Sequence, residues 1–313
     1  MGIFSWAMRW ATRPATFFTN TCANLLHSRR MNRDLEGRLF IITGANTGVG
    51  RASAENIAAR GGTLILAGRS LERTQPVIDA IRKLPDAPEV SFVSLDLGSL
   101  ANVRRAADEI LKRDVHIDVL LNNAGLAGQP GVTEDGFEKT FGTNHVGPFL
   151  FTEKLLPLLG KDRASRIVNV ASRAHYDAKP IEWDALKKTT RTRTALPEYA
   201  VSKLANVLHA KELAVRLEGK PITTYALHPG VVATDVWRAL PKPIGAFVKL
   251  FMLSVEDGAK TQLHCATSDA ARNETGLYYD KSAVKKPSRL ALDAALANEL
   301  RDRSLTWVKP FLG

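Results

Sequence analysis

The sequence Arg38-Leu-Phe-Ile-Ile-Thr-Gly-Ala-Asn-Thr-Gly-Val-Gly50 joins an apolar, β-branched run to a glycine-rich turn. The apolar run predicts a buried parallel strand, and residues 51–60 predict the helix that follows the turn. Such a turn presents backbone N–H groups at a helix N-terminus, where a pyrophosphate can bind. The glycine spacing is a variant of the dinucleotide fingerprint, and its strand–turn–helix context makes it specific. We therefore expect a dinucleotide to be held by Gly44, Asn46, Thr47, Gly48, Val49 and Gly50.

The end of the next predicted strand, residues 63–67, indicates which dinucleotide this is. An acidic residue at this point would bind the ribose 2′-hydroxyl of NAD. The sequence has Arg69 instead, and Arg51 directly follows the glycine turn. Two guanidinium groups suit a 2′-phosphate, so we expect NADP(H) to be preferred over NAD(H). The alternative is that Arg69 is an ordinary surface loop residue.

Further strands are predicted at residues 90–95, 117–121, 166–171 and 222–227, with helical stretches between them. This alternation predicts a Rossmann-type, doubly wound parallel sheet with right-handed crossovers. An edge strand at residues 276–279 would bring the sheet to about seven strands. We expect residues 37–313 to form a single domain.

Ligands bind such sheets at the carboxyl ends of the strands. The residues at these ends are Asp96, Leu97, Asn123, Ala124, Gly125, Ser172, Pro229, Gly230, Val232 and Thr234. The small residues among them let the backbone approach a cofactor closely. Asp96 could hydrogen-bond an adenine amine, or it could be an ordinary loop or cap carboxylate.

Tyr199-Ala-Val-Ser-Lys203 places a phenol and an ammonium one helical turn apart on one face. A free phenol titrates near pH 10 and is a poor acid or base at neutral pH. A neighbouring ammonium favours the phenolate, and roughly 4 kcal/mol of differential interaction would bring the pKa to about 7. The alternative is a helix-surface pair without a function. The motifs at the strand ends favour the catalytic interpretation.

Residues 1–36 predict a basic amphipathic arm, because residues 1–33 contain no acidic residue and mix arginines with Trp and Phe. No apolar run approaches the ~20 residues that a spanning helix needs, and Trp6 breaks the myristoylation pattern. Three interpretations remain: a helix in a membrane interface, an organellar presequence, or a helix packed on the domain. A cytoplasmic or peripheral membrane location is expected, with organellar targeting left open.

Composition narrows the functional class. The net charge of +11 is spread along helix faces and mixed with acids, which is typical of a solvated surface. No basic motif with interleaved aromatic residues is present, so nucleic acid is not an expected partner. The two cysteines, Cys22 and Cys265, form neither a disulfide framework nor a Cys/His cluster, and we expect no metal.

Taken together, these motifs resemble those of the short-chain dehydrogenase/reductase family. The resemblance covers residues 39–279 and rests on the glycine turn, Asn122-Asn-Ala-Gly125, Asn144, Ser172, Tyr199-x-x-x-Lys203 and Pro229-Gly230. The details Ala67-Gly-Arg-Ser70, Ser202-Lys-Leu-Ala-Asn-Val-Leu208 and His228-Pro-Gly-Val-Val232 are most similar to the branch of retinol dehydrogenases and WW-domain oxidoreductase. No WW module accompanies them.

The resemblance implies a role for each matched residue. Tyr199 would be the general acid or base, and Ser172 would polarise the substrate oxygen. Lys203 would lower the pKa of the tyrosine and bind the nicotinamide ribose, while Asn144 would hold a water that relays protons. Hydride passes directly between cofactor and substrate, so no metal is needed. For the nearby His145 and His175, packing or solvent contact is the default expectation, and a role at the substrate is the alternative.

The family carries its substrate lid at the position of residues 235–253, which are rich in bulky apolar side chains. A lipophilic substrate is therefore expected, such as a retinoid, a steroid or a long-chain aldehyde. The alternative for the lid is packing on the domain or on a second subunit. Family members commonly pair through helices at residues 135–159 and 198–217, which makes a homodimer an expected assembly.

Two other functions stay open. One is a double-bond reductase of the protochlorophyllide reductase type, which shares much of this pattern. The other is a non-catalytic NADP-binding redox sensor, although such sensors usually lose the Tyr or the Lys. At the C-terminal end, Ser254 is predicted to cap a helix that ends near residue 267, and a polar, exposed helix is expected at residues 288–303.

Overall fold

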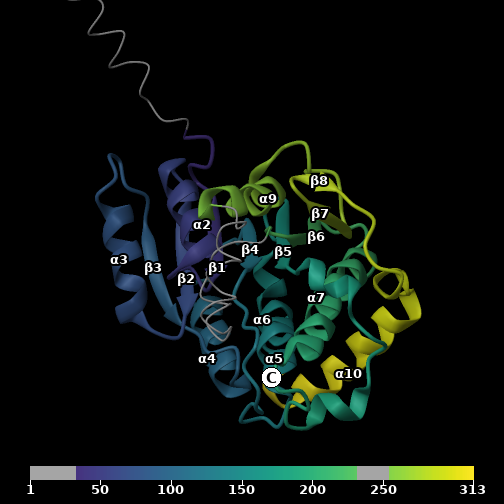
Figure 1. The fold of residues 1–313 in the computed structure, drawn as a ribbon. Coiled ribbons are helices and arrows are strands. Elements are labelled where there is room, and N and C mark those ends of the chain that lie inside the picture. Colours follow the sequence, from purple (N-terminus) through teal and green to yellow (C-terminus); the bar gives the residue numbers. More distant parts are fainter. Residues whose placement is uncertain (1–32, 231–253) are drawn as a thin grey trace, which may run out of the picture.

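The computed structural model describes residues 33–230 and 254–313 (Figure 1). Within this part of the chain, eight strands form one sheet in the order β3-β2-β1-β4-β5-β6-β7-β8. The strands are β1 (Leu39–Thr43), β2 (Thr63–Gly68), β3 (Val90–Ser94), β4 (Val119–Asn122), β5 (Ser165–Val170), β6 (Ile222–His228), β7 (Leu277–Asp280) and β8 (Ala283–Val284). Strands β1 to β7 are parallel, and β8 pairs antiparallel with β7. The predicted doubly wound sheet is confirmed.

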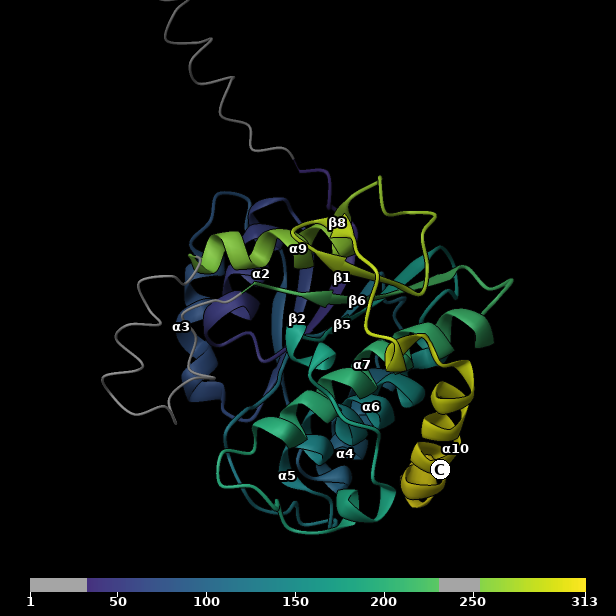
Figure 2. The ribbon, with the colours of Figure 1, turned by 45° about the vertical axis from the view of Figure 1, so that its right-hand side comes forward.

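Helices cover both faces of the sheet (Figure 2). On one face lie α2 (Gly48–Ala59), α3 (Leu71–Arg82) and α9 (Val255–Thr267), and on the other lie α4 (Leu100–Leu111), α6 (Gly147–Leu155) and α7 (Leu196–Arg216). Successive side chains of a strand point to opposite faces. Phe40 and Ile42 accordingly pack under α2, whereas Ile41 packs under α4 and α6. A strand buried on both faces needs the continuous apolar run that the sequence has.

The predicted amphipathic segment at residues 135–159 is divided into several helical pieces. These are α5 (Lys139–Phe141), the π-helical turn η1 (Gly142–Val146), α6 and a 3-10 turn, η2 (Leu156–Leu158). The first piece begins after Glu138, whose carboxylate accepts the N–H of Phe141 at 2.7 Å as an N-cap. Asn144 lies inside the π-helical turn, a distortion that is frequent at functional sites.

The prediction of an edge strand at residues 276–279 was wrong about the edge. The chain turns back after β7, and β8 forms the edge instead. The two turn residues, Lys281 and Ser282, have φ angles of 54° and 59°. A two-residue hairpin turn needs this left-handed backbone and is usually signalled by Asn-Gly or Asp-Gly. The hairpin was missed because Lys-Ser carries no such signal.

The expectation of a helix at residues 288–303 is confirmed in part, but its bounds and its full exposure were wrong. Helix α10 (Ala294–Leu312) begins later, runs longer and lies beside α7 (Figure 1). Ala297, Leu300, Ser304 and Val308 form its buried stripe. Their spacing of three to four residues is that of one helix face. The charged residues between them, Glu299, Arg301, Asp302 and Arg303, made the segment look polar.

The start of the described chain is already packed on the domain. Leu35 is fully buried, and its N–H donates to the main-chain oxygen of Arg60. The rest of the basic arm and the lid at residues 235–253 lie outside the described residues. Among the helices of the described part, none combines the length and apolarity that crossing a membrane requires.

Candidate active site

A cavity of about 1380 Å³ opens at the carboxyl ends of the strands. Most of the residues predicted from the sequence line it: Gly44, Asn46, Thr47, Gly48, Val49, Gly50, Arg69, Asp96, Leu97, Asn123, Ala124, Gly125, Ser172, Tyr199, Lys203, Pro229 and Gly230. Arg51 and Asn144 are not among the lining residues. Val232 and Thr234 lie outside the described residues. Most of the residues predicted from the sequence to form the site therefore lie together in the wall of one cavity.

Ser172 comes directly after Ala171 at the end of β5 and caps the short 3-10 turn η3 (Arg173–Tyr176). Its Oγ accepts the N–H of Ala174 at 3.2 Å. This bond occupies one lone pair and leaves the hydroxyl proton free to be donated elsewhere. A hydroxyl held in this way is suited to polarise a carbonyl oxygen in the cavity.

Tyr199 and Lys203 reach the cavity from the first turns of α7, and both are buried. Nζ of Lys203 lies 5.7 Å from the centre of the Tyr199 ring and donates to the main-chain oxygen of Val170 at 2.8 Å. Burial lowers the pKa of Lys203 to about 8. Burial also raises the pKa of Tyr199, which a hydrogen bond from Ser172 partly offsets.

The raised pKa of Tyr199 corrects the expectation that Lys203 depresses it. Burial penalises the phenolate more than a distant ammonium stabilises it, and Nζ is directed toward Val170. The phenol is therefore the favoured form at neutral pH. A protonated phenol is the form that can donate a proton.

Asn144 lies behind the cavity wall, almost fully buried. Its amide nitrogen donates to the main-chain oxygen of Leu126 at 2.9 Å and to Oγ of Ser202 at 3.0 Å. Its Oδ1 accepts the N–H of Leu126 at 2.8 Å. The side chain thus joins α7 to the loop after β4, and the relay of protons through a water stays a prediction.

Comparisons with known proteins agree with this geometry. A family profile described as short chain dehydrogenase matches residues 38–184. Retinol dehydrogenase 13 from Homo sapiens is 38% identical over 275 residues, which cover 85% of this chain and 83% of that protein. The chain belongs to the short-chain dehydrogenase family. Dehydrogenase/reductase SDR family member 13 from Homo sapiens is 36% identical over 280 residues, or 87% of this chain and 73% of that protein.

Solved structures of the same fold support the assignment. An uncharacterised protein from Mycobacterium paratuberculosis superposes with a TM-score of 0.71 and 33% identity, covering 88% of this chain and 94% of that one. A short-chain dehydrogenase from Escherichia coli CFT073, solved with NADPH, has a TM-score of 0.63 and 24% identity, covering 80% and 99%. At that identity the second comparison concerns the fold alone.

As a short-chain dehydrogenase, the protein is an oxidoreductase that uses a nicotinamide dinucleotide, and the glycine turn fits this cofactor. Gly44 has a φ of 68°, in the region that favours glycine. A Cβ on Gly50 would lie 2.5 Å from the oxygen of Gly44 and would also clash with the side chain of Asn123. Thr47 makes no side-chain cap to α2. The first N–H groups of this helix can therefore serve a phosphate.

Asn123 holds the glycine turn rather than simply lining the cavity. Its amide nitrogen donates to the oxygens of Thr43 and Gly44 at 2.8 and 3.1 Å. The hydroxyl of Thr43 accepts in return the N–H groups of Asn123 and Ala124 at 3.0 and 2.9 Å. Thr43, which was expected only to end a strand, therefore joins β1 to the residues after β4 beside the glycine turn.

Three arginines lie near the glycine turn and the end of β2, and they differ in whether they line the cavity. Arg69 and Arg73 both line the cavity beyond the end of β2. Arg51 points elsewhere, and its Nε donates to Glu55 at 2.8 Å across the exposed side of α2. Arg73 was missed from the sequence because it lies in the first turn of α3, after the N-cap Ser70, and not at the strand end itself. The signal that could have found it is the position of that helix N-terminus beside the cavity.

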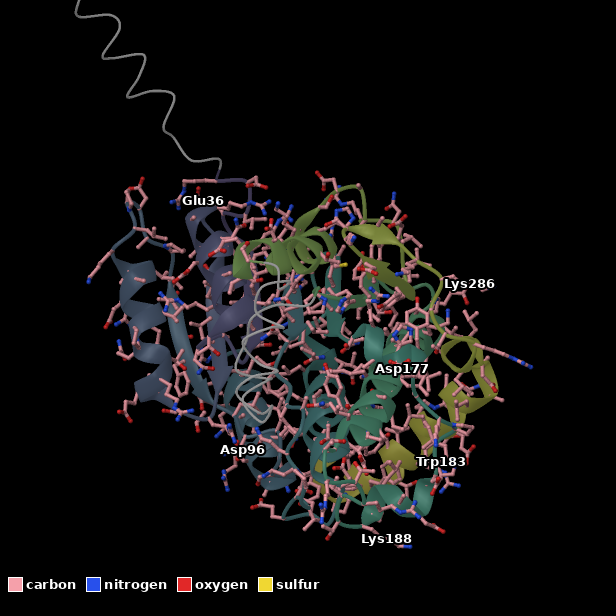
Figure 3. The ribbon with its side chains drawn as sticks, in the orientation of Figure 1. Glu36, Asp96, Asp177, Trp183, Lys188 and Lys286 are labelled. Carbon is pink, nitrogen blue, oxygen red and sulfur yellow. The ribbon has the colours of Figure 1, made fainter. Side chains whose placement is uncertain are left out.

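Asp96 was predicted to line the site, whereas His145 and His175 were expected by default to pack or to meet solvent. Asp96, labelled in Figure 3, lines the cavity beyond β3. Its Oδ1 accepts the N–H of Gly98 at 2.9 Å. His145 and His175 are buried and are not among the lining residues. His228, which was not predicted, lines the cavity at the end of β6. Burial lowers its pKa to about 4, so its imidazole is neutral at physiological pH.

Proposed function

We propose that the protein interconverts a carbonyl and an alcohol on a lipophilic substrate, with NADP(H) as the hydride carrier. The observation that carries this proposal is the convergence of Ser172, Tyr199 and Lys203 on the same cavity as the glycine turn. A hydroxyl donor, a phenol and an ammonium beside a dinucleotide site are the groups that carbonyl reduction requires.

In the reduction direction, each residue has a distinct task. The bound cofactor supplies the hydride. Ser172 donates a hydrogen bond from its hydroxyl to the substrate oxygen, keeps its own proton, and holds that oxygen in place. Tyr199, protonated because burial raises its pKa, transfers its proton to the same oxygen. Lys203 stabilises the phenolate that remains. In the oxidation direction, the phenolate would have to form first, so oxidation is favoured at higher pH.

The preference for NADP(H) rests on Arg69 and Arg73. They supply two positive charges where an acidic residue would select NAD. Charge-assisted hydrogen bonds from guanidinium groups to a phosphate are among the stronger ones in proteins. The role expected for Arg51 is assigned to Arg73 in this proposal, because Arg51 is paired with Glu55.

A lipophilic substrate is supported by the relatives and by the rim of the cavity. Proteins 36% to 38% identical to this chain are named retinol dehydrogenases 11 and 13. Val132 and Leu196, which line the cavity, are 47% and 39% exposed. Exposed aliphatic side chains around a pocket are a common feature of sites for apolar ligands.

The test is an assay of NADPH consumption by the purified full-length protein with retinal, steroid ketones, long-chain aldehydes and quinones. Reduction of at least one carbonyl to its alcohol, identified by mass spectrometry, is expected. Binding of NADPH without any turnover would instead favour the redox sensor. A product reduced at a carbon–carbon double bond would favour the protochlorophyllide reductase type.

A further inference from the structure

The turn that follows Ser172 is held by a buried histidine. His175 lies in η3 and is fully buried. Its Nδ1 lies 2.6 Å from the main-chain oxygen of Ser172. On the opposite side of the ring, the N–H of Ser288 donates to Nε2 at 3.1 Å. The imidazole therefore bridges the turn and a segment more than a hundred residues further along the chain.

Only one form of the imidazole satisfies both contacts. The N–H of Ser288 can only donate, so Nε2 has to carry the lone pair. The ring proton is then on Nδ1, from which it donates to the oxygen of Ser172. Burial lowers the pKa of His175, partly opposed by its bond to Ser172, so this neutral form prevails at physiological pH. The oxygen of Ser172 also accepts the backbone N–H of His175 at 3.2 Å.

A second contact ties the same turn to the same segment. The hydroxyl of Tyr176 donates to the main-chain oxygen of Lys286 at 2.6 Å. In Figure 3, Lys286 is labelled on the C-terminal segment and Asp177 directly follows the turn. The rings of Tyr176 and Tyr278 pack on His175, with centroids 4.1 and 4.7 Å away. The turn is thus clamped on one side by residues of the C-terminal segment.

We propose that His175 is a positioning residue for Ser172: its Nδ1–H fixes the backbone of the serine, and thereby the direction of the hydroxyl that binds the substrate oxygen. This inference rests on the proposed function, because it assigns Ser172 to the substrate. His175 itself is not among the residues that line the cavity.

Two substitutions test the two hydrogen bonds of the imidazole separately, the one at Nδ1 and the one at Nε2. In His175→Asn, the amide lies near the former Nδ1 and can still donate to Ser172. In His175→Gln, the amide reaches the former Nε2 position and can serve Ser288 but not Ser172. We expect kcat of His175→Asn to stay within about threefold of the wild type. We expect kcat of His175→Gln to fall roughly 10- to 100-fold, the range for a reacting group misplaced by about 1 Å. The Kd for NADPH should be unchanged in both.

The same pair is then measured in a Ser172→Ala background. If His175 acts through Ser172, the Gln substitution should add no further loss there. A loss that persists without the serine hydroxyl, or equal losses in the Asn and Gln variants, would overturn the inference. Nitrogen-15 NMR of the wild-type protein gives an independent readout that needs no variant. It should find the ring neutral and protonated on Nδ1, and a proton on Nε2 would also overturn the inference.

The failure of this inference can be told apart from that of the proposed function. A wild-type protein that reduces no carbonyl would contradict the proposed function, and the kinetic role of His175 with it. If the wild type is active and the His175 variants have the same kcat as the wild type, the inference is refuted and the proposed function is not.

Discussion

Lys203 donates a hydrogen bond from Nζ to the main-chain oxygen of Val170 across 2.8 Å. The bond fixes the helix that carries Tyr199 to the strand that delivers Ser172. The separation of phenol and hydroxyl is therefore set by main-chain geometry as well as by side-chain packing. Rigid elements of this kind hold a reacting constellation more accurately than loops do.

Tyr199→Phe should abolish carbonyl reduction and leave NADPH binding intact. Only the proton donor is removed, and a positioned acid contributes about 10²- to 10⁴-fold to a rate. The measurement compares steady-state turnover with the fluorescence titration of NADPH. Tyr225→Phe is a suitable control, because its hydroxyl bonds to Ala271 on the opposite face of the sheet. Turnover of Tyr199→Phe at the wild-type rate would refute the assignment.

Arg69→Ala and Arg73→Ala should each weaken NADPH binding by about 10-fold or more while changing NADH binding little. A hydrogen bond to a charged group is worth about 1.5–3 kcal/mol, and NADH has no phosphate to lose. Arg51→Ala is the matched control, and its effect on the ratio of the two affinities should be small because Arg51 is paired with Glu55. The affinities can be measured by fluorescence titration. If Arg69→Ala and Arg73→Ala weaken the binding of NADPH and NADH equally, these arginines do not explain a preference for NADP(H).

The stability of the protein should depend on the protonation of Lys203 at alkaline pH. Its pKa is about 8 in the folded protein against an ordinary value of 10.5, so the unfolded chain binds this proton more tightly. Unfolding free energy therefore rises with pH between about 8 and 10.5, by roughly 3 kcal/mol for a complete shift. Lys203→Met lacks this contribution. Urea melts should diverge from the wild type across that window, and parallel curves would show that the ammonium is not buried.

Leu300→Ala on α10 should destabilise the protein by about 2–5 kcal/mol, since its side chain is only 1% exposed and the truncation leaves a cavity. Leu292→Ala, whose side chain is 42% exposed, should change stability by no more than about 0.5 kcal/mol. Thermal and urea unfolding of the two variants can be compared directly. Similar effects at both positions would mean that α10 does not complete the core.

The local structure was predicted best at positions where the backbone conformation allows only one type of residue. The glycine turn after β1 and the strand ends around it were predicted because backbone approach leaves few alternatives to glycine. Prediction failed where tertiary contacts decide. The left-handed turn at Lys281 and Ser282 has no local signal, and the buried stripe of α10 is diluted by charged neighbours.

The same distinction applies to the candidate site. Ser172, Tyr199 and Lys203 were found because their spacing and their place at strand and helix ends are visible in the chain. Arg73 was not predicted, and His175 was expected by default only to pack or to meet solvent, because the roles proposed for them depend on which segments meet in space. The direction of the pKa shift of Tyr199 was wrong for a related reason. A sequence shows that a charge is near, but not how much water the fold removes.

Helix α10 has a consequence for how the protein is made. It packs on α7 and contributes Leu300 and Val308 to the same core as Leu204 and Leu208. During translation, α7 leaves the ribosome about eighty residues before α10 does, which at about 5–20 residues per second is a delay of several seconds or more. Throughout that interval the face of α7 that α10 covers in the folded protein is without that helix. It is then a natural substrate for a chaperone that shields nascent polypeptides.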